Sequence, residues 1–585
     1  MKTGKLISIA LLSLAVACSK ENVTSNQGGS DANQYMAVDI AMSVGSSTKA
    51  PADYRDGSEA ESTVNVKNSI FLFYDAYGNF LTSGVISATD GSVDENGNLK
   101  LSTANSPFVE NESKAVIVLG PTRLRPALVL AVLNYDNCDT LKNLSLADAH
   151  SQVDNREIST EAGKFTMTNS VYVDGKNIVN ATPIAASSVK ETKEEALKTP
   201  VQIYVEREVA KVNMKAKDGL KKTAEGKICF ETPNAESVLD GVKVSARIVV
   251  DGWAANAFNT TSYLVKDVPA SWLVTYPFAN WYEEAAKRTF WAQDPNYSGS
   301  EEYVFGRTPE GEPGTYKNVK YLSWEEATLN KVDTYNYMYE NTTDKASARV
   351  NGGELANVPT ILIAAHVETA KTGAAWERQD IYKFGGLFYT DASLRNYAAE
   401  QILKGKLHWE YTTAEGLKIA SVAPDQVKAK FVANVADNSG SVKVEVEAVT
   451  APAEGAKLMK EDNSVIESAV WAKTVEDILN GENGFNIAKK ELVCFKNGMC
   501  YYQVPIKHNQ TAEDVAYGTV RNHIYELTLS KIAKIGNPVF DPKEKLVLIP
   551  GEELLRICRT QGSQMASCYS GCCNRVICNC CRHRQ

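Results

Sequence analysis

The sequence predicts an all-β protein built from two β-sandwiches. Short apolar or alternating runs recur along the 585 residues, and turn signals rich in Gly, Asn and Asp separate them. Long amphipathic helices are few, and 26 tyrosines with recurring clusters of Val and Thr favour strands. The formal net charge of −9 is modest, and no basic patch is interleaved with aromatic residues, so nucleic acid is not an expected partner.

Residues 1–17 predict a lipoprotein signal peptide. A basic start is followed by an apolar segment, residues 6–17, that is too short to span a bilayer, and small residues precede Cys18. The alternative is a plain signal peptide followed by a chance cysteine. In the lipoprotein interpretation Cys18 carries the lipid anchor and residues 19–33 form a polar tether.

Residues 34–44 predict a half-buried β-strand that can be removed. Apolar side chains fall on every second position, with small or polar residues between them. These apolar residues are Met36, Val38, Ile40, Met42 and Val44. The loop that follows, residues 45–57, carries two targets for a trypsin-like protease, Lys49 and Arg55. The alternative is an ordinary first strand beside basic residues that are never cut.

The first sandwich is predicted over residues 56–204. A buried strand at residues 69–74 runs into a turn at 75–79 and returns, which predicts a hairpin. The other expected elements are strands at 114–119, 125–133, 165–169 and 171–173, a short helix within 141–153 and a charged connector at 190–198.

Residues 201–214 predict the boundary between the sandwiches. Apolar residues occupy the odd positions up to Val205, and the pattern then continues in a changed phase at Val209 and Val212. A phase change is typical of a bend or bulge where a strand passes from one sheet to another. The boundary is therefore placed at about Val205, and the second sandwich is expected over residues 205–545.

The second sandwich is expected to contain several strands and one short helix. The strands are predicted at 241–250, 360–367, 441–448, 499–506 and 523–529. Ser393 is the expected N-cap of a helix over 393–404, and Gly405 is placed to end it. The region 253–339 is rich in aromatic residues, among them Trp281; these either cap the core, which we favour, or form a binding surface.

No motif points to an enzyme. The six histidines match no metal-ligand spacing, and the sequence has no P-loop, dinucleotide fingerprint or Gly-x-Ser-x-Gly elbow. The scattered carboxylates do not single out a catalytic pair. No cofactor and no metal site are therefore expected.

Residues 546–585 form an aberrant, cysteine-rich tail. Seven cysteines crowd between Cys558 and Cys581 in spacings that match no zinc site well. Reading one base later turns Met565 and the following alanine codon into a tryptophan codon, and it turns several of the cysteines into Val or Ala. That frame resembles a strand, so a frameshift after about Leu546 is favoured over a genuine cysteine tail, a metal knuckle or a disulfide knot.

Several stretches together resemble the Bacteroidales fimbrillins, and among them the major shaft subunits of the short fimbriae. The resemblance runs through residue 540. The stretches that carry it are the lipobox ending at Cys18, the strand at 35–44 before its loop, and residues 204–212, 335–341, 498–508 and 520–527.

The resemblance implies two transthyretin-like Greek-key β-sandwich domains and export as a lipoprotein. It also implies cleavage by an arginine-specific protease in the loop after the first strand. By position the cut falls between Lys49 and Ala50; by residue type it falls between Arg55 and Asp56, which we rank slightly ahead. Residues 18–55 are then a propeptide, whose loss opens a groove for the C-terminal strand of another subunit.

The implied function is that of a structural subunit of a cell-surface fimbrial shaft, with a precursor anchored to the outer membrane by lipid. The implied partners are further copies of the chain arranged head to tail, accessory tip and anchor subunits, the maturation protease, and host or bacterial surface ligands. The alternatives are a surface lipoprotein that binds glycan through residues 253–339, and a tip or anchor subunit of the same fimbria. The sequence departs from the family at its tail, where the donor strand is expected.

Overall fold

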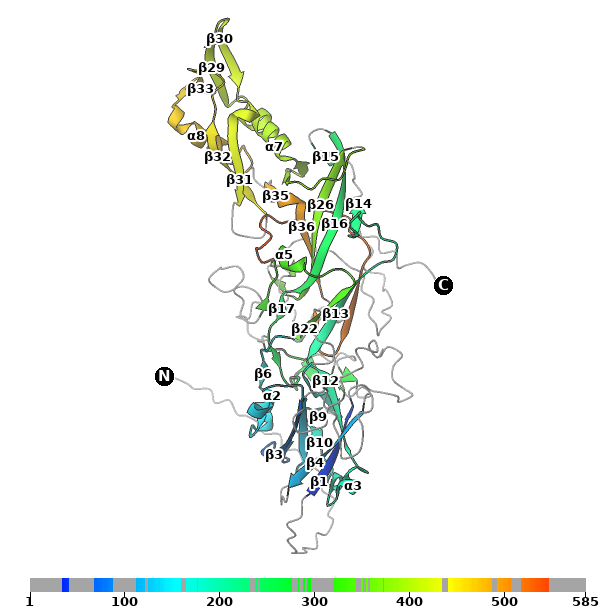
Figure 1. Cartoon of the computed structure of the whole chain (residues 1–585). Coiled ribbons are helices and arrows are strands. Elements are labelled where there is room, and N and C mark those ends of the chain that lie inside the picture. Colours follow the sequence, from blue (N-terminus) through cyan, green and yellow to red (C-terminus); the bar gives the residue numbers. More distant parts are fainter. Residues whose placement is uncertain are drawn as a thin grey trace, which may run out of the picture.

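The computed structural model describes residues 34–41, 68–87, 112–120, 125–158, 165–175, 177–231, 237–239, 242–275, 282–283, 288–289, 292–295, 319–342, 349–350, 354–355, 358–371, 373–433, 440–486, 492–506 and 517–546. The fold of this portion is all-β with short helices, as the sequence predicts. Figure 1 shows an elongated molecule with three successive parts, which we call the first, second and third part.

The first part is a large sheet with hydrophobic clusters on both faces. Its strands run in the order β11 (Val189–Lys190), β1 (Gln34–Ala41), β12 (Val201–Arg207), β7 (Met167–Asn169), β5 (Leu128–Leu133), β2 (Asn68–Tyr74) and β3 (Phe80–Ser87), with β4 (Glu112–Gly120) also on β1 and β10 (Thr182–Pro183) on β5. The predicted hairpin at residues 69–81 is confirmed as β2 and β3.

Strand β2 shows why the runs in this part are so apolar. Phe71 and Phe73 point into one cluster, and Ile70, Leu72 and Tyr74 into another on the opposite face. A strand that is buried on both faces has no polar positions to alternate with apolar ones. At its end Asp75 accepts hydrogen bonds from the backbone N–H groups of Tyr77 and Asn79, at 2.8 and 2.9 Å, and so closes the turn.

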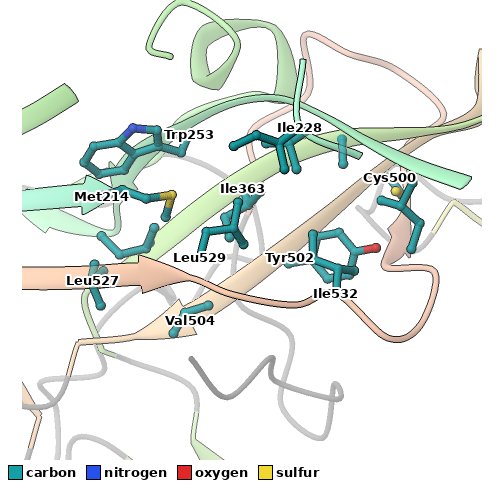
Figure 2. Packing of buried hydrophobic residues seen from close by; sticks show 14 of the residues in the cluster. Met214, Ile228, Trp253, Ile363, Cys500, Tyr502, Val504, Leu527, Leu529 and Ile532 are labelled. Atoms are coloured by element: carbon teal, nitrogen blue, oxygen red, sulfur yellow. The ribbon is translucent and has the colours of Figure 1, made fainter. Parts of the chain in front are cut away.

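The second part packs two sheets against each other. One consists of β22 (Thr334–Tyr339), β13 (Val209–Ala216) and β38 (Ile524–Leu529). The other consists of β14 (Cys229–Glu231), β16 (Val242–Asn256), β26 (Thr360–Lys371), β36 (Met499–Pro505) and β39 (Asn537–Pro538), with β15 (Ser237–Leu239) beside β16. Figure 2 shows their shared core, where Met214 and Leu527 face Trp253 and Ile363.

The third part has a core of its own, within the range expected for the second sandwich. Three small sheets form it. The first contains β28 (Leu387–Tyr389), β27 (Ile381–Phe384) and β35 (Val493–Phe495), and the second contains β30 (Gly416–Ser421), β29 (Leu407–Thr413), β33 (Lys457–Lys460) and β34 (Val465–Ile466). The third pairs β31 (Val427–Ala433) with β32 (Val442–Val449). Two helical segments pack on them: α7 (Asp391–Tyr397), which continues as the π-helical turn η4 (Ala398–Leu403), and α8 (Trp471–Asn480). The core includes Trp409 and Leu458, both fully buried.

Short elements connect the first and second parts. Strand β6 (Val153–Asp154), which follows the first part's strand β5 in the chain, pairs with β18 (Ser262–Tyr263), which follows β16 of the second part. Strand β23 (Asn341–Thr342) pairs with β37 (Gly518–Thr519), and both adjoin strands of the second part. The remaining short elements are β8 (Tyr172–Asp174), β9 (Asn177–Val179), β17 (Phe258–Asn259), β19 (Tyr282–Glu283), β20 (Arg288–Thr289), β21 (Val319–Lys320), β24 (Arg349–Val350), β25 (Glu354–Leu355), α2 (Leu146–His150), α3 (Lys193–Ala196), α4 (Trp272–Thr275) and α5 (Trp324–Ala327).

The expected helices need four corrections. The N-cap of α7 is Thr390, not Ser393, because Thr390 has extended backbone angles and its side chain accepts from the Ser393 N–H. The helix expected within 141–153 is limited to α2 and a preceding 3₁₀ turn. Helix α8 was missed, and the connector at 190–198 contains α3, whose N-cap Thr192 accepts from the N–H of Glu195.

Candidate functional site: the first strand and its slot

Strand β1 lies inside the sheet of the first part, not at its edge. Along its whole length it pairs antiparallel with β4, from Gln34 opposite Gly120 to Ala41 opposite Glu112. On its other side it runs parallel to β12 over residues 38–41, and two residues at its start pair antiparallel with β11. The space that β1 fills between β4 and the two strands β11 and β12 is called the slot.

The predicted core face of β1 is confirmed by Met36, Val38 and Ile40, which are fully buried in the cluster that also contains Ile203. The expectation of a half-buried strand is wrong, because the intervening Ala37 and Asp39 are only 0% and 8% exposed. Short helix α3 lies close to this strand.

Contacts with the slot also involve the backbone and the second face of β1. The Gln202 side chain donates from Nε2 to the carbonyl oxygen of Asp39, at 3.1 Å. At the start of the strand the Lys193 Nζ of α3 lies 5.9 Å from the centre of the Tyr35 ring, within the range of a cation–π contact. The slot therefore recognises an extended strand through its main chain as well as through apolar side chains.

The free energy contributed by β1 is comparable to the stability of a whole domain. Fully burying an aliphatic side chain contributes about 1.5–3 kcal/mol, so Met36, Val38 and Ile40 together contribute roughly 4.5–9 kcal/mol. A typical domain is stable by about 5–15 kcal/mol. Without β1, the facing backbones of β4 and β12 would be two open edges beside an apolar trough. An empty slot is therefore a strong site for another strand.

The residues that line the slot were not singled out as functional from the sequence. Val201 and Ile203 of β12 lie opposite Val38 and Ile40, and all four side chains belong to one cluster. The signal was present, because residues 201–205 alternate as cleanly as β1 does. The alternation alone does not show that β12 lines the slot, because this follows only from its parallel pairing with β1, which lies more than 150 residues away in the sequence.

Most of the other predicted site residues fall outside the part of the chain that the structure describes. These are the lipid-anchor candidate Cys18, the cleavage candidates Lys49, Ala50, Arg55 and Asp56, and the strand residues Met42 and Val44.

The tryptophans that are described in the aromatic region are core residues. Trp253 is fully buried in strand β16, not in a loop, and its Nε1 donates to the Lys331 carbonyl oxygen at 2.8 Å. Trp324 is 9% exposed and donates to the carbonyl oxygens of Ala365 and Cys500. Trp281 lies outside the described residues. The described tryptophans of region 253–339 therefore offer no exposed ring for stacking on a sugar.

The described titratable side chains do not assemble a metal site. No group of three or more His, Cys, Asp or Glu in this portion is arranged to hold an ion. His366, on β26 as expected, is buried, and its Nδ1 lies 2.6 Å from Asp251 Oδ2. None of the described helices is long and apolar enough to cross a membrane.

Comparison with known proteins identifies the C-terminal region. The family profile "Major fimbrial subunit protein type IV, Fimbrillin, C-terminal" matches residues 493–553. This range includes β36 and β38, one from each sheet of the second part, and it ends before Cys558. No curated protein sequence matches the chain significantly.

Solved structures with distant similarity include an adhesion protein and two fimbrial proteins. A putative cell adhesion protein from Parabacteroides distasonis is 10% identical over 88% of this chain and 96% of its own, with a TM-score of 0.31. A fimbrilin from Porphyromonas gingivalis W83 is 12% identical over 86% of this chain and 91% of its own, with a TM-score of 0.29. A C-terminally truncated tip fimbrial protein, Mfa3, from Porphyromonas gingivalis is 10% identical over 86% of this chain and 96% of its own, also with a TM-score of 0.29.

Similarity at these scores establishes neither a common architecture nor a common function. The match over residues 493–553 is independent of it and agrees with the sequence stretches described above. Within the chain, residues 493–553 therefore match the C-terminal region of the fimbrillins.

Proposed function

We propose that this protein is a structural subunit of a fimbrial shaft, which polymerises when β1 is removed and a strand of another copy fills the slot. The observation that carries the proposal is the position of β1 between β4 and β12, where three fully buried side chains and both strand edges depend on it. The family match supports a fimbrial role. The role is structural and requires no catalytic step.

Processing would convert a stable precursor into a subunit that is ready to assemble. The loop after β1 contains Lys49 and Arg55, and a cut after either residue breaks the connection between β1 and the rest of the chain. Cutting also separates the subunit from Cys18, which would hold the precursor at the outer membrane through its lipid. One cleavage therefore releases the subunit and opens the slot.

The slot specifies what its next occupant looks like. A strand that takes the place of β1 in the same direction runs antiparallel to β4 and parallel to β12, and it must place apolar side chains where Met36, Val38 and Ile40 lie. A strand donated by one copy to the next makes a contact that does not close on itself, so repetition yields a filament. Such a filament displays every subunit at the surface, where adhesion to host or bacterial ligands takes place.

The C-terminal tail bears directly on this assembly. The donor is expected near the C-terminus, where the sequence has seven cysteines after residue 557. We propose that the reading frame shifts after about Leu546 and that the other frame encodes the donor strand. Resequencing the 3′ end of the gene tests this: an independent clone with the same frame removes the idea.

Replacement of Lys49 and Arg55 together by glutamine tests the proposed processing. We expect the double variant to stay at the membrane as a lipidated precursor and to form no SDS-resistant ladder. The matched control replaces Lys418 and Lys473, two lysines of the third part whose side chains are 48% and 66% exposed, and it should assemble normally. A ladder formed by the Lys49 and Arg55 variant would contradict cleavage-dependent assembly.

A tip or anchor subunit and a glycan-binding lipoprotein remain the competing functions, and the same experiment separates them from a shaft subunit. A subunit at the tip or anchor joins at most once, so purified protein gives no ladder even after cleavage. A glycan-binding lipoprotein keeps Cys18 and binds sugar without forming a ladder, and Trp281→Ala abolishes that binding.

A further inference from the structure

The junction between the first and second parts contains a buried cluster of charged side chains. Three stretches that resemble the fimbrillins, 204–212, 335–341 and 520–527, supply four of its members. We call the following residues the junction cluster: Asp154, Arg156, Glu206, Glu208, Lys266, Glu340 and Arg521. All of them except Arg156 are at most 2% exposed. Buried charges are rare in proteins unless each is paired.

Arg521 holds the second part to the segment that reaches the first. Its Nε lies 3.0 Å from Glu340 Oε2, and its other nitrogens donate to the carbonyl oxygens of Leu264 and Tyr263, at 3.3 and 2.7 Å, and to Ser262 Oγ, at 3.1 Å. The negative charge of Glu340 is therefore matched by its own cation.

Two further carboxyl groups in the cluster also have a cation of their own. Lys266 Nζ lies 3.1 Å from Glu206 Oε2 and donates to the carbonyl oxygen of Thr289 at 2.9 Å. Arg156 binds both oxygens of Asp154, with its closest nitrogen 2.6 Å from Oδ2. Each of these two carboxyl groups is therefore paired with a cation, although burial still raises the pKa of Glu206 above its ordinary value.

Glu208 is the exception. No cation among the described residues lies within salt-bridge distance of it, and its Oε1 has no hydrogen-bond partner there. Its carboxyl group is instead hydrogen-bonded to that of Asp154. Two carboxyl groups can form a hydrogen bond only when one of them carries a proton, because ionised carboxylates only accept. Asp154 is already held as an acceptor by Arg156, so the proton belongs on Glu208.

The surroundings of the pair agree with this assignment. Burial, and then the negative charge of Asp154, raise the pKa of Glu208 well above its ordinary value. Although burial alone would raise it, the hydrogen bonds from Arg156 hold the pKa of Asp154 below its ordinary value. The other groups that face the pair are Arg156 itself, Arg521 before β38, Tyr135 after β5 and Tyr339 at the end of β22.

The pair lies where the two parts are held together. Glu208 separates β12, whose first residues border the slot, from β13 of the second part. Asp154 is on β6, which pairs with β18 from the second part, and the next N–H in that segment, of Leu264, donates to the carbonyl oxygen of Gln152 at 2.9 Å. A change of charge here acts on the elements that connect the parts.

We propose that Glu208 and Asp154 share one buried proton and act as a pH-sensitive latch: when Glu208 ionises, the two carboxylates repel each other and the junction between the first and second parts loosens. This inference does not depend on polymerisation, and it holds for a shaft, tip or anchor subunit alike.

Infrared spectroscopy of the full chain tests the shared proton directly. At about pH 7, well above the ordinary Glu pKa of about 4.3, the wild-type protein should show the carbonyl stretch of a protonated carboxyl group. Glu208→Gln should lose that contribution, because glutamine donates to Asp154 without titrating. In Asp154→Asn the band should vanish at a lower pH than in the wild type. A difference spectrum without such a band between wild type and Glu208→Gln would overturn the proposal.

The pH dependence of stability tests the latch. The unfolded chain releases the Glu208 proton at the ordinary pKa of a glutamate, whereas the folded chain releases it only at a higher pH. The contribution of this proton to folding stability is therefore complete below the pKa of the unfolded chain, and it is lost as the pH rises toward the pKa of the folded chain. The folding equilibrium constant should fall up to about tenfold per pH unit in that window. Glu208→Gln should flatten this fall.

Hydrogen exchange locates the effect at the junction. The protection factor of the Leu264 amide, corrected for the intrinsic pH dependence of exchange, should fall with rising pH in the wild type and not in Glu208→Gln. Glu526→Gln is the matched control, since Glu526 is on β38 but pairs with the exposed Lys215 at 3.3 Å; it should behave as wild type. Equal pH profiles for wild type and Glu208→Gln would contradict the latch.

Discussion

Ile40→Ala should weaken the precursor but leave the mature filament unchanged. Ile40 is fully buried on β1, in register with the equally buried Ile203 of β12. Truncating a buried isoleucine to alanine costs about 2–5 kcal/mol. For a domain of about 150–250 residues each kcal/mol lowers the melting temperature by about 2–4 °C, so the first part of the precursor should melt roughly 4–20 °C lower.

Ile203→Ala is the matched control, because Ile203 lines the same slot but stays in the chain after processing. It should destabilise both the precursor and the filament. Thermal unfolding of the full-length precursor gives the first comparison, and the temperature at which filaments dissociate in SDS gives the second. Filaments of Ile40→Ala that dissociate as early as those of Ile203→Ala would mean that β1 is still seated in the filament and has not been replaced.

Three further predictions concern buried residues outside the slot. Arg521→Met leaves Glu340 buried without its cation, so it should lower the free energy of unfolding, measured by chemical denaturation, by about 3–5 kcal/mol. Adding Glu340→Gln should recover part of this loss, and no recovery would contradict the pairing. Gly498→Ala should lower the free energy of unfolding by at least about 1–3 kcal/mol, because Gly498 has a φ of +69° and an added Cβ would lie 2.4 Å from a backbone carbonyl oxygen. An unchanged melting curve would contradict this expected strain. Burial raises the pKa of the Cys494 thiol to about 12, so in the native protein half-buried Cys138 should react with a thiol reagent before Cys494 does, and mass mapping with the reverse order would contradict this packing.

The strands with clear sequence periodicity were predictable, because their side chains record the burial of each face. The patterns at 241–250, 360–367 and 499–506 correspond to β16, β26 and β36, which form one sheet. Alternation in β1 likewise gave its core face. It could not reveal that the other face is also covered, because small Ala37 reads equally well as an exposed or a buried residue, and the neighbouring strands come from distant segments.

The junction cluster shows a harder limit of sequence reasoning. Single charged residues in a sequence indicate solvent exposure, and Arg521 pairs with Glu340 across 181 residues of chain. Only the fold brings these residues together. Helix α8 was missed for a simpler reason: it begins after a 3₁₀ turn without a side-chain cap, so the usual start signal is absent.

The N-terminus of the protein in assembled surface filaments shows whether β1 has left the slot. Mass spectrometry of purified filaments should find a first residue of Ala50 or Asp56 and no peptide from residues 34–41. Filaments in which Gln34–Ala41 is still covalently part of each subunit would rule out assembly by strand replacement, because the slot would then never have opened.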